Sequence, residues 1–236
     1  MGIRPLYVRV MRLARAGLAR NGALDRMAAS RRPVVRHLRT LFALYDARDL
    51  ASLDLPWWTY RAIDEVERFL ASRPGARVFE YGSGASTVWL ARRADRVESV
   101  EHDLRFAAEV RDLVDGLDNV VLHEVPATTT EAQAVVRSGR HGQTDLDFGA
   151  YVRAIDRVGG RFDLVVIDGR ARVACLHHAL DHLAEDGLVV FDDVRRRRYR
   201  TVMELDDVEI RVLTGAKPCL PYRDATALLR RRRTRA

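Results

Sequence analysis

Apolar and polar positions follow a helical period in the first well-patterned segment, residues 56–75. Apolar side chains recur there three and four positions apart, at Ile63, Val66, Phe69 and Leu70, and a Pro-Gly pair ends the segment. This spacing places the apolar side chains on one face of a helix. We therefore expect an amphipathic helix that packs against a core.

Beyond residue 75, short apolar runs alternate with helical stretches. The pattern predicts strands at 77–81, 96–100, 120–125, 162–168 and 188–191, and helices at 86–94, 105–114, 151–158 and 173–184. Continuous apolar runs such as LVVI and LVVF fit strands that are buried on both faces, as in a parallel sheet. The alternation predicts a doubly wound α/β domain. Two further strands, near 208–213 and around Cys219, would complete a mostly parallel, seven-stranded sheet.

Two flanking parts differ from this domain in composition. Residues 1–50 are predicted to form a basic helical extension, with one amphipathic helix at 3–20. Residues 226–236 are predicted to form a basic tail, which leaves residues 51–225 for the α/β domain. The helix at 3–20 fits docking on an anionic membrane surface or a polyanion, but a solvated arm or a helix packed on its own domain is favoured.

Charge is distributed unevenly along the chain. The net charge of +7 combines +8 in residues 1–50, −9 in residues 51–194 and +8 in residues 195–236. Of the 40 basic residues, 39 are arginine and one, Lys217, is lysine. A uniformly cationic surface is excluded, and the acidic centre argues against nucleic-acid binding by the central domain.

Other classes of protein are excluded by simpler features. No run approaches the roughly 18 apolar residues of a membrane-spanning helix. Arginines interrupt any signal-peptide apolar region near the N-terminus. Cys175 and Cys219 are too few for a disulfide framework and lack metal-ligand spacing. We expect two reduced cysteines in a cytoplasmic protein, peripheral to a membrane if residues 3–20 dock there.

The segment VFEYGSGASTVWLA, residues 78–91, carries the first candidate chemistry. A predicted strand ends in Glu80 and Tyr81, and a turn with Gly82 and Gly84 leads into a helix. Glycines permit a tight turn and a close approach of the backbone to a ligand. A dinucleotide site would favour a third glycine where Thr87 stands, so pyrophosphate binding is disfavoured.

Glu101 ends the next predicted strand, 19 residues after Gly82. An acid at that position can accept hydrogen bonds from both hydroxyls of a ribose, because the ends of the two strands are neighbours in such a sheet. The carboxylate of Glu80 beside the turn disfavours phosphate and favours a cationic ligand. Together these residues predict a positively charged, adenosine-type cofactor.

This combination resembles the class I S-adenosylmethionine-dependent methyltransferases, whose first motif reads acid-x-Gly-x-Gly. The resemblance covers about residues 75–215 and implies a Rossmann-like methyltransferase fold. It implies that Glu80 supports the methionine end of the cofactor and that Glu101 holds the ribose, with His102 nearby. The turn residues that would pass beside the cofactor are Gly82, Ser83 and Gly84.

Three further acids end two predicted strands: Asp168 in FDLVVID, and Asp192 and Asp193 in LVVFDD. The carboxyl ends of neighbouring parallel strands face one crevice, and three carboxylates there would repel one another unless a hard cation bound them. The arrangement resembles the metal-dependent O-methyltransferases of the catechol and macrocin types. That resemblance implies Mg²⁺ held by all three acids. A metal-free alternative has Asp168 as general base and the other two as helix caps.

Several neighbouring residues fit either a functional or a structural role. Arg170 and Arg172 suit the binding of a substrate carboxylate or phosphate, or the neutralisation of the acids. His177 and His178 each fit a general base or an ordinary helical residue. Trp57, Trp58 and Tyr60 fit a substrate wall or core packing.

From these residues we expect methyl transfer from S-adenosylmethionine to a hydroxyl of a small molecule or sugar, assisted by a divalent metal, with Asp168 as the catalytic residue. Two alternatives stay open. One is an RNA methyltransferase guided by the Arg-rich ends. The other is a non-enzymatic module that binds an adenosine ligand and docks on a membrane or polyanion.

Overall fold

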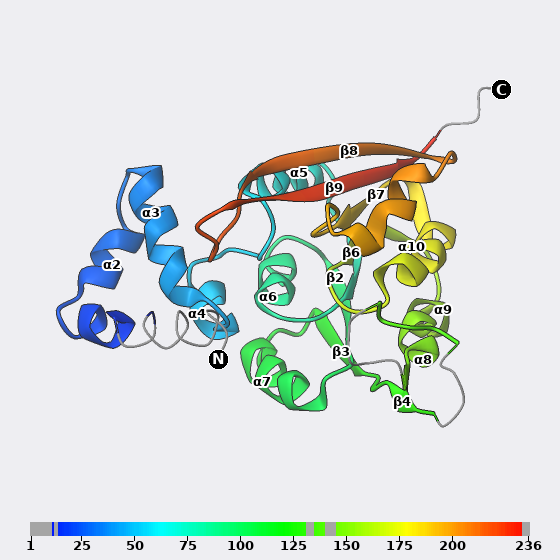
Figure 1. Ribbon diagram of the computed structural model, residues 1–236, viewed down its shortest axis with the longest axis horizontal. Helices are drawn as coiled ribbons and strands as arrows, with labels where there is room; N and C mark the ends of the chain where they lie inside the picture. The colour runs from blue at the N-terminus through cyan, green and yellow to red at the C-terminus, as the bar shows by residue number, and fades with distance from the viewer. Residues whose placement is uncertain (1–10, 12–13, 131–134, 140–144, 233–236) are drawn as a thin grey trace.

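A seven-stranded sheet with helices on both faces forms the centre of the molecule, as the computed structural model shows (Figure 1). The structure describes residue 11 and residues 14–130, 135–139 and 145–232. The order of the strands across the sheet is β3-β2-β1-β6-β7-β9-β8. Their bounds are β1 Arg77–Tyr81, β2 Arg96–Glu101, β3 Val120–Glu124, β6 Phe162–Ile167, β7 Leu183–Phe191, β8 Val208–Ala216 and β9 Arg223–Arg231.

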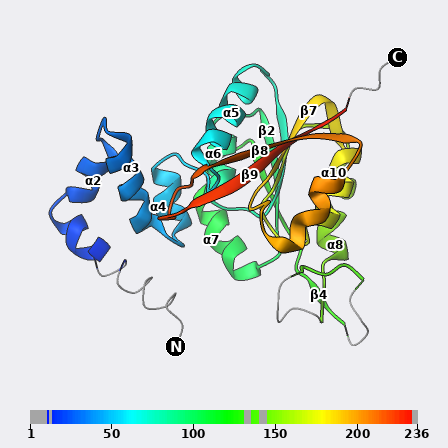
Figure 2. The same ribbon diagram turned by 45° about the horizontal axis from the view of Figure 1, so that its top comes forward.

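Strict alternation of side chains gives the sheet two buried faces. In β6, Leu164 and Val166 pack on one face, while Val165 and Ile167 pack on the other. Figure 2 shows α5, α6 and α7 on one side of the sheet and α8 and α10 on the other. The bounds of the helices that cover the sheet are α5 Tyr60–Ala71, α6 Ala85–Ala91, α7 Leu104–Val114, α8 Gly149–Val152, α9 Ala154–Val158 and α10 Arg172–Asp181. The doubly wound α/β domain predicted from the sequence is confirmed.

The topology of the sheet brings the ends of its central strands together. Strands β3, β2, β1, β6 and β7 run parallel, and β9 is antiparallel to both of its neighbours. The chain leaves β1 toward β2 on one side, and β6 returns on the other side of β1. Crevices for ligands form at such a reversal, outside the carboxyl ends of the strands. The residues after β1, β2, β6 and β7 therefore border one region.

The described part of the segment between β3 and β6 contains two short strands and two short helices. Strands β4 (Thr128–Thr129) and β5 (Leu146–Asp147) pair antiparallel, apart from the main sheet. The Asp147 carboxylate then accepts the amide of Gly149 at 2.7 Å, at the start of α8. The single helix predicted at 151–158 is therefore two helices, α8 and α9.

The N-terminal helices pack on the domain through a third apolar cluster. Their bounds are α2 Ala23–Ala28, α3 Pro33–Thr40, η1 Leu41–Ala43 and α4 Ala47–Ser52. Leu44 and Leu50 belong to this cluster together with Val88 of α6, and a buried two-bond ion pair joins Arg39 to Asp49 at 3.0 and 2.6 Å. The predicted helix at 3–20 lies mostly outside the described residues, although residues 14–20 are helical. Membrane docking by that segment stays a prediction.

The C-terminal part of the sheet differs from the sequence prediction. The strand predicted around Cys219 is wrong: that residue has φ 67° and lies in the turn between β8 and β9. Strand β9 continues to Arg231, so residues 226–231 belong to the sheet and not to a tail. The predicted helix at 173–184 is too long, since α10 ends at Asp181 and β7 begins at Leu183. Among the helices that the structure describes, none has the length and apolar character needed to cross a membrane.

Candidate active site

The loop after β1 crosses the loop after β6 at backbone contact distance. Gly82 has φ 94°, a conformation that favours glycine, and a Cβ added there would lie 2.6 Å from the Cα of Gly169. The amide of Gly82 donates to the carbonyl of Val100 at 2.9 Å, and the amide of Asp168 donates to the carbonyl of Tyr81 at 3.0 Å. Gly82 is therefore needed by the fold itself.

Gly84 is the second glycine of the turn, and its surroundings are different. Its φ of 162° is extended backbone that any residue adopts, and an added Cβ would meet only the ring of Phe106, at 3.8 Å. Its amide donates to the Thr87 hydroxyl at 2.9 Å, which fixes the start of α6. Neither sterics nor conformation requires a glycine at this buried position.

Glu80 lies beneath this turn and is fully buried. Its carboxylate accepts hydrogen bonds from three hydroxyls, those of Ser86 at 2.5 Å, Thr87 at 2.5 Å and Ser99 at 2.6 Å. The Ser83 hydroxyl lies 2.7 Å from that of Ser99 and extends the network into the turn. Glu80 thus holds the Gly-containing turn from below.

Burial raises the pKa of Glu80 to about 7, because loss of solvation outweighs the three hydroxyl hydrogen bonds that favour the charged form. The support of a cofactor's methionine end by Glu80, expected from the sequence, stays a prediction. The structure places its carboxylate in the layer below the turn.

Glu101 ends β2 beside the turn, as predicted. Its Oε1 accepts the backbone amides of His102 and Asp103, each at 2.8 Å, which anchors the carboxylate at the strand end. The His102 ring lies 5.6 Å from the Phe148 ring and 5.8 Å from the Tyr151 ring. The Nε of Arg170 lies 3.4 Å from the Nε2 of His102. The structure therefore brings Glu101, His102 and the Gly-containing turn to the same end of the sheet.

The three predicted acids also come together. Oxygens of Asp168, after β6, and of Asp192 and Asp193, after β7, all lie within 4.8 Å of one another. The Asp168 side chain is 23% exposed, whereas those of Asp192 and Asp193 are buried. Asp193 has φ 56°, so the chain turns sharply at the strand end. Neither residue caps a helix, because the turn after them leads to a 3₁₀ segment, η2 Arg197–Glu204.

Two buried cations sit among these acids. The Nζ of Lys217 lies 2.5 Å from Asp192 Oδ2 and 3.0 Å from Asp193 Oδ1. Arg172 donates to Asp168 Oδ1 at 2.7 Å and lies 3.4 Å from Asp193 Oδ2. Of the two roles considered for Arg172, the structure therefore supports the neutralisation of the acids. We call these five residues the charged cluster.

Further partners complete the coordination of the two buried acids. The Thr226 hydroxyl of β9 donates to Asp192 Oδ1 at 2.8 Å, and Arg196 forms an ion pair with Asp193 Oδ2. Asp224 Oδ2 lies 3.6 Å from the Lys217 ammonium. Each oxygen of Asp192 and Asp193 thus already contacts a donor of the protein.

The pKa values within the charged cluster diverge. Burial raises the pKa of Asp168 to about 8, with the nearby carboxylates adding to burial and Arg172 opposing it. Burial also raises the pKa of Asp192. Burial acts in the same direction on Asp193, but the charges of Lys217 and Arg172 outweigh it and hold that pKa well below its usual range. Carboxylates with separated pKa values suit different roles in acid–base chemistry.

The remaining predicted residues lie in structural positions. Trp58 is fully buried in the core, edge-on to Trp89 at 5.7 Å between ring centroids. Trp57 packs edge-on against Tyr45. His178 Nδ1 lies 2.8 Å from an oxygen of Asp156. None of these contacts joins the charged cluster.

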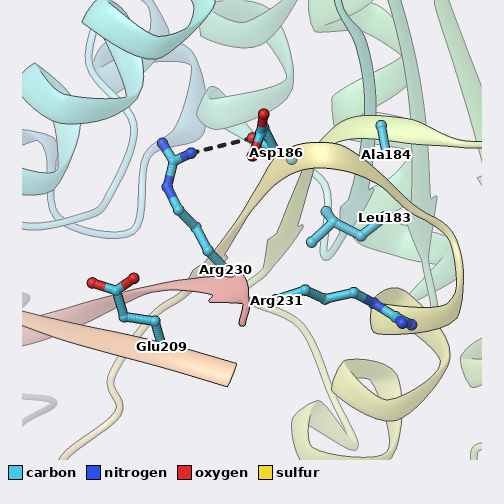
Figure 3. Close-up of a pocket in the computed structure, with 7 residues that line it drawn as sticks. Leu183, Ala184, Asp186, Glu209, Arg230 and Arg231 are labelled. Carbon is cyan, nitrogen blue, oxygen red and sulfur yellow. Dashed lines mark hydrogen bonds between the residues drawn. The ribbon is translucent and has the colours of Figure 1, made fainter. Parts of the chain in front are cut away.

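A pocket of about 230 Å³ lies at the opposite end of the sheet (Figure 3). Its lining includes Leu183 and Asp186 near the start of β7, Glu209 near the start of β8, and Arg230 and Arg231 at the end of β9. Arg230 donates to the backbone carbonyl of Asp186 at 3.2 Å, the dashed line in Figure 3. The carboxyl ends of the parallel strands point away from this pocket, so it is separate from the candidate site.

Sequence reasoning missed Lys217, Thr226 and Ser99 as members of the site. Lys217 and Thr226 come from the β8–β9 hairpin, whose return across β7 no local pattern predicts. One property of the sequence did distinguish Lys217, since it is the only lysine among 40 basic residues. The fold places this single lysine beside Asp192 and Asp193.

Comparison with known proteins agrees with this geometry. Residues 79–194 match a family model described as a methyltransferase domain. No curated protein sequence matches the chain significantly. A Klebsiella pneumoniae structure, named as that of a candidate O-methyltransferase, has 18% identity and a TM-score of 0.56, covering 89% of this chain and 95% of that one.

Two further structures have the same fold. The O-methyltransferase from Bacillus cereus, in complex with SAH, has 18% identity and a TM-score of 0.53, covering 80% of this chain and 89% of that one. An rRNA methylase from Streptococcus thermophilus has 13% identity and a TM-score of 0.50, with 72% and 95% covered. At these identities the likeness concerns the fold, which serves more than one class of methyl acceptor.

Proposed function

The chain carries a class I methyltransferase domain, and on that premise we propose that it transfers a methyl group from S-adenosylmethionine to a hydroxyl of a small molecule or sugar. The observation that carries the proposal is the meeting of the Gly-containing turn with Glu101 at one end of the sheet. The acceptor rests on a second observation, the partly exposed Asp168 at the end of β6.

The residues around the turn fit the cofactor. Gly84 has no side chain, although neither its conformation nor its neighbours require a glycine, and we assign to the cofactor the space that a side chain would take. Glu101 is held by two amides in a position to accept ribose hydroxyls. The central part of the chain has a net charge of −9, which favours a cationic ligand. When bound, S-adenosylmethionine supplies a methyl group attached to a positively charged sulfur.

Asp168 is the residue that we assign to proton transfer. A neutral hydroxyl is a weak nucleophile, and a carboxylate within hydrogen-bond reach can take its proton during the reaction. Burial raises the pKa of Asp168 to about 8, which makes this carboxylate a stronger base than an exposed aspartate. Arg172 holds its Oδ1 at 2.7 Å and fixes its orientation. The proton of the acceptor hydroxyl passes to Asp168.

Metal assistance, expected from the sequence, is not part of this mechanism. The carboxylate oxygens of Asp192 and Asp193, which would have to bind the metal, already contact donors of the protein. These donors belong to Lys217, Thr226, Arg172 and Arg196. A divalent ion at these acids would have to displace Lys217. The residues present therefore do not fit a metal as they stand, and we derive no step through one.

The proposal is tested by calorimetric titration of S-adenosylmethionine, SAH and NAD into the purified protein. We expect binding of the first two and none of NAD, with Glu101→Ala weakening the binding about tenfold or more, as loss of a charge-assisted hydrogen bond predicts. NAD binding without S-adenosylmethionine binding would refute the proposal. Transfer of a radioactive methyl group to panels of hydroxylated small molecules, sugars and RNA then identifies the acceptor, and RNA as the only acceptor would refute the hydroxyl assignment.

A further inference from the structure

The only lysine of the chain is buried in the charged cluster. Its side chain is 5% exposed, in a protein whose other 39 basic residues are all arginine. Arginine serves everywhere else on this chain, including the buried ion pair of Arg39 with Asp49. The use of lysine at position 217 therefore follows from something that a guanidinium does not provide.

A compact point charge is the property that separates the two side chains. A guanidinium is planar and presents its donors in a fork, whereas an ammonium concentrates its charge on one atom with three N–H donors around it. Lys217 Nζ faces oxygens of three different carboxylates, at 2.5 Å for Asp192, 3.0 Å for Asp193 and 3.6 Å for Asp224. Oxygens converging on one point from several side chains are also the arrangement by which proteins hold a hard cation.

The ammonium and a divalent ion would compete for the same position. Mg²⁺ requires its oxygen ligands at about 2.0–2.1 Å in octahedral geometry. An ion bound to Asp192 Oδ2 and Asp193 Oδ1 would lie between the two oxygens that now contact Nζ. The other oxygens of these acids are already occupied, by the Thr226 hydroxyl and by Arg196. Lys217 and a metal therefore exclude each other.

The balance of charge among these residues also argues against a bound metal. Asp168, Asp192, Asp193 and Asp224 face Lys217, Arg172 and Arg196, four acids against three cations. One proton shared among the acids makes the group neutral. No divalent ion is needed to relieve repulsion between the carboxylates.

We propose that the Lys217 ammonium takes the place of the divalent cation in this crevice, so that the chain binds no metal there and transfers methyl groups without one. Lys217 is a positioning residue in this role: it compensates the charge of Asp192 and Asp193 and leaves Asp168 to the acceptor. The statement about methyl transfer rests on the proposed function, whereas the statement about ion binding rests on the contacts of Lys217 alone.

The test begins with the unmodified protein. Mn²⁺ is titrated in and the free ion is followed by electron paramagnetic resonance, with Asp192→Asn as the comparison. We expect free Mn²⁺ to equal the amount added for both proteins. Retention of one Mn²⁺ by the unmodified protein, lost in Asp192→Asn, would overturn the proposal. This measurement needs neither a substrate nor an active enzyme, so failure of the proposed methyl transfer would leave its outcome unchanged.

Two variants then distinguish the effect of removing the central charge of Lys217 from the effect of removing any one positive charge. Lys217→Ala vacates the central point, and we expect it to bind Mn²⁺ at least tenfold more tightly than the unmodified protein. Arg196→Gln removes one positive charge from the exposed rim and leaves Lys217 in place, so we expect no gain of Mn²⁺ binding. Equal uptake by both variants, or a folded Lys217→Ala protein that binds no ion, would overturn the proposal.

Stability gives a readout if Lys217→Ala is only marginally folded. Mg²⁺ at a hundredfold excess over its dissociation constant should raise the melting temperature of that variant by about 5 °C or more. The unmodified protein should melt at the same temperature with Mg²⁺ or with a chelator. A Mg²⁺-dependent rise in the unmodified protein would contradict the proposal.

Discussion

Glu80→Gln should change how the stability of this protein depends on pH. Glu80 is fully buried, and its carboxylate accepts the hydroxyls of Ser86, Thr87 and Ser99. Glutamine has the same shape, and hydroxyls can accept from its amide as well as donate to its oxygen. The variant therefore keeps the network beneath the Gly-containing turn and removes only the ionisation.

The magnitude follows from the pKa of Glu80, which burial raises from 4.5 to about 7. Between those values the folded protein binds more protons at this residue than the unfolded chain does, so stability falls as pH rises. The contribution is fully present below pH 4.5 and is lost as pH rises through 7. The full shift corresponds to about 3 kcal/mol, of which about 2.5 kcal/mol falls between pH 5 and pH 8.

The assay is urea unfolding of the unmodified protein and of Glu80→Gln across this pH range. Other buried acids titrate in both proteins, so the quantity to follow is the difference in unfolding free energy between the two. That difference should move by about 2.5 kcal/mol in favour of Glu80→Gln from pH 5 to pH 8. Glu109→Gln, at an exposed position of α7, is the matched control and should run parallel to the unmodified protein. A difference that stays constant with pH would refute our account of Glu80.

Further predictions concern the turn and the acids. Gly82→Ala should lower the melting temperature strongly, because its Cβ would overlap the backbone of Gly169 at 2.6 Å, whereas Gly84→Ala should fold normally and lose S-adenosylmethionine binding. Thermal unfolding and calorimetry check both, and equal loss of stability in the two variants would contradict the assignment. Glu101→Gln should weaken cofactor binding by about 1.5–3 kcal/mol, measured by calorimetry, through loss of charge-assisted hydrogen bonds. The rate of methyl transfer should increase with pH up to about 8, as Asp168 loses its proton. Asp168→Asn should lower this rate at least a hundredfold and abolish its increase with pH. An unchanged pH profile in Asp168→Asn would exclude this residue as the base.

The parallel part of the sheet could be predicted from the sequence because its information is local. Strands such as 77–81 and 162–167 are short apolar runs bounded by turns and helices, and their burial on both faces requires such runs. The antiparallel hairpin of β8 and β9 carries a weaker local signal. Strand β9 carries arginines at both ends and reads as a polar tail, yet residues 225–229 between them are fully or nearly fully buried.

The candidate site also contains some residues that local sequence patterns predict and others that they do not. Gly82, Glu101 and Asp168 directly follow or end their strands, so the order of strands alone brings them together. Lys217 reaches the acids from a turn about 25 residues further along the chain, at 2.5 Å from Asp192. A long-range contact of this kind leaves no periodic pattern, so the sequence shows three converging acids, which predict a metal, but not the positive charge that faces them.

The placement of β9 between β7 and β8 has a consequence for biosynthesis. Strand β7 precedes its partner by some thirty residues, and both Lys217 and Thr226 emerge from the ribosome after the acids that they contact. Until β9 inserts, β7 is an open edge and its terminal carboxylates have no ammonium beside them. The end of the sheet that carries the candidate site acquires its final charge only when the last strand is in place. A chain cut short before residue 217 would therefore lack the buried ammonium of the charged cluster even with Asp168, Asp192 and Asp193 present.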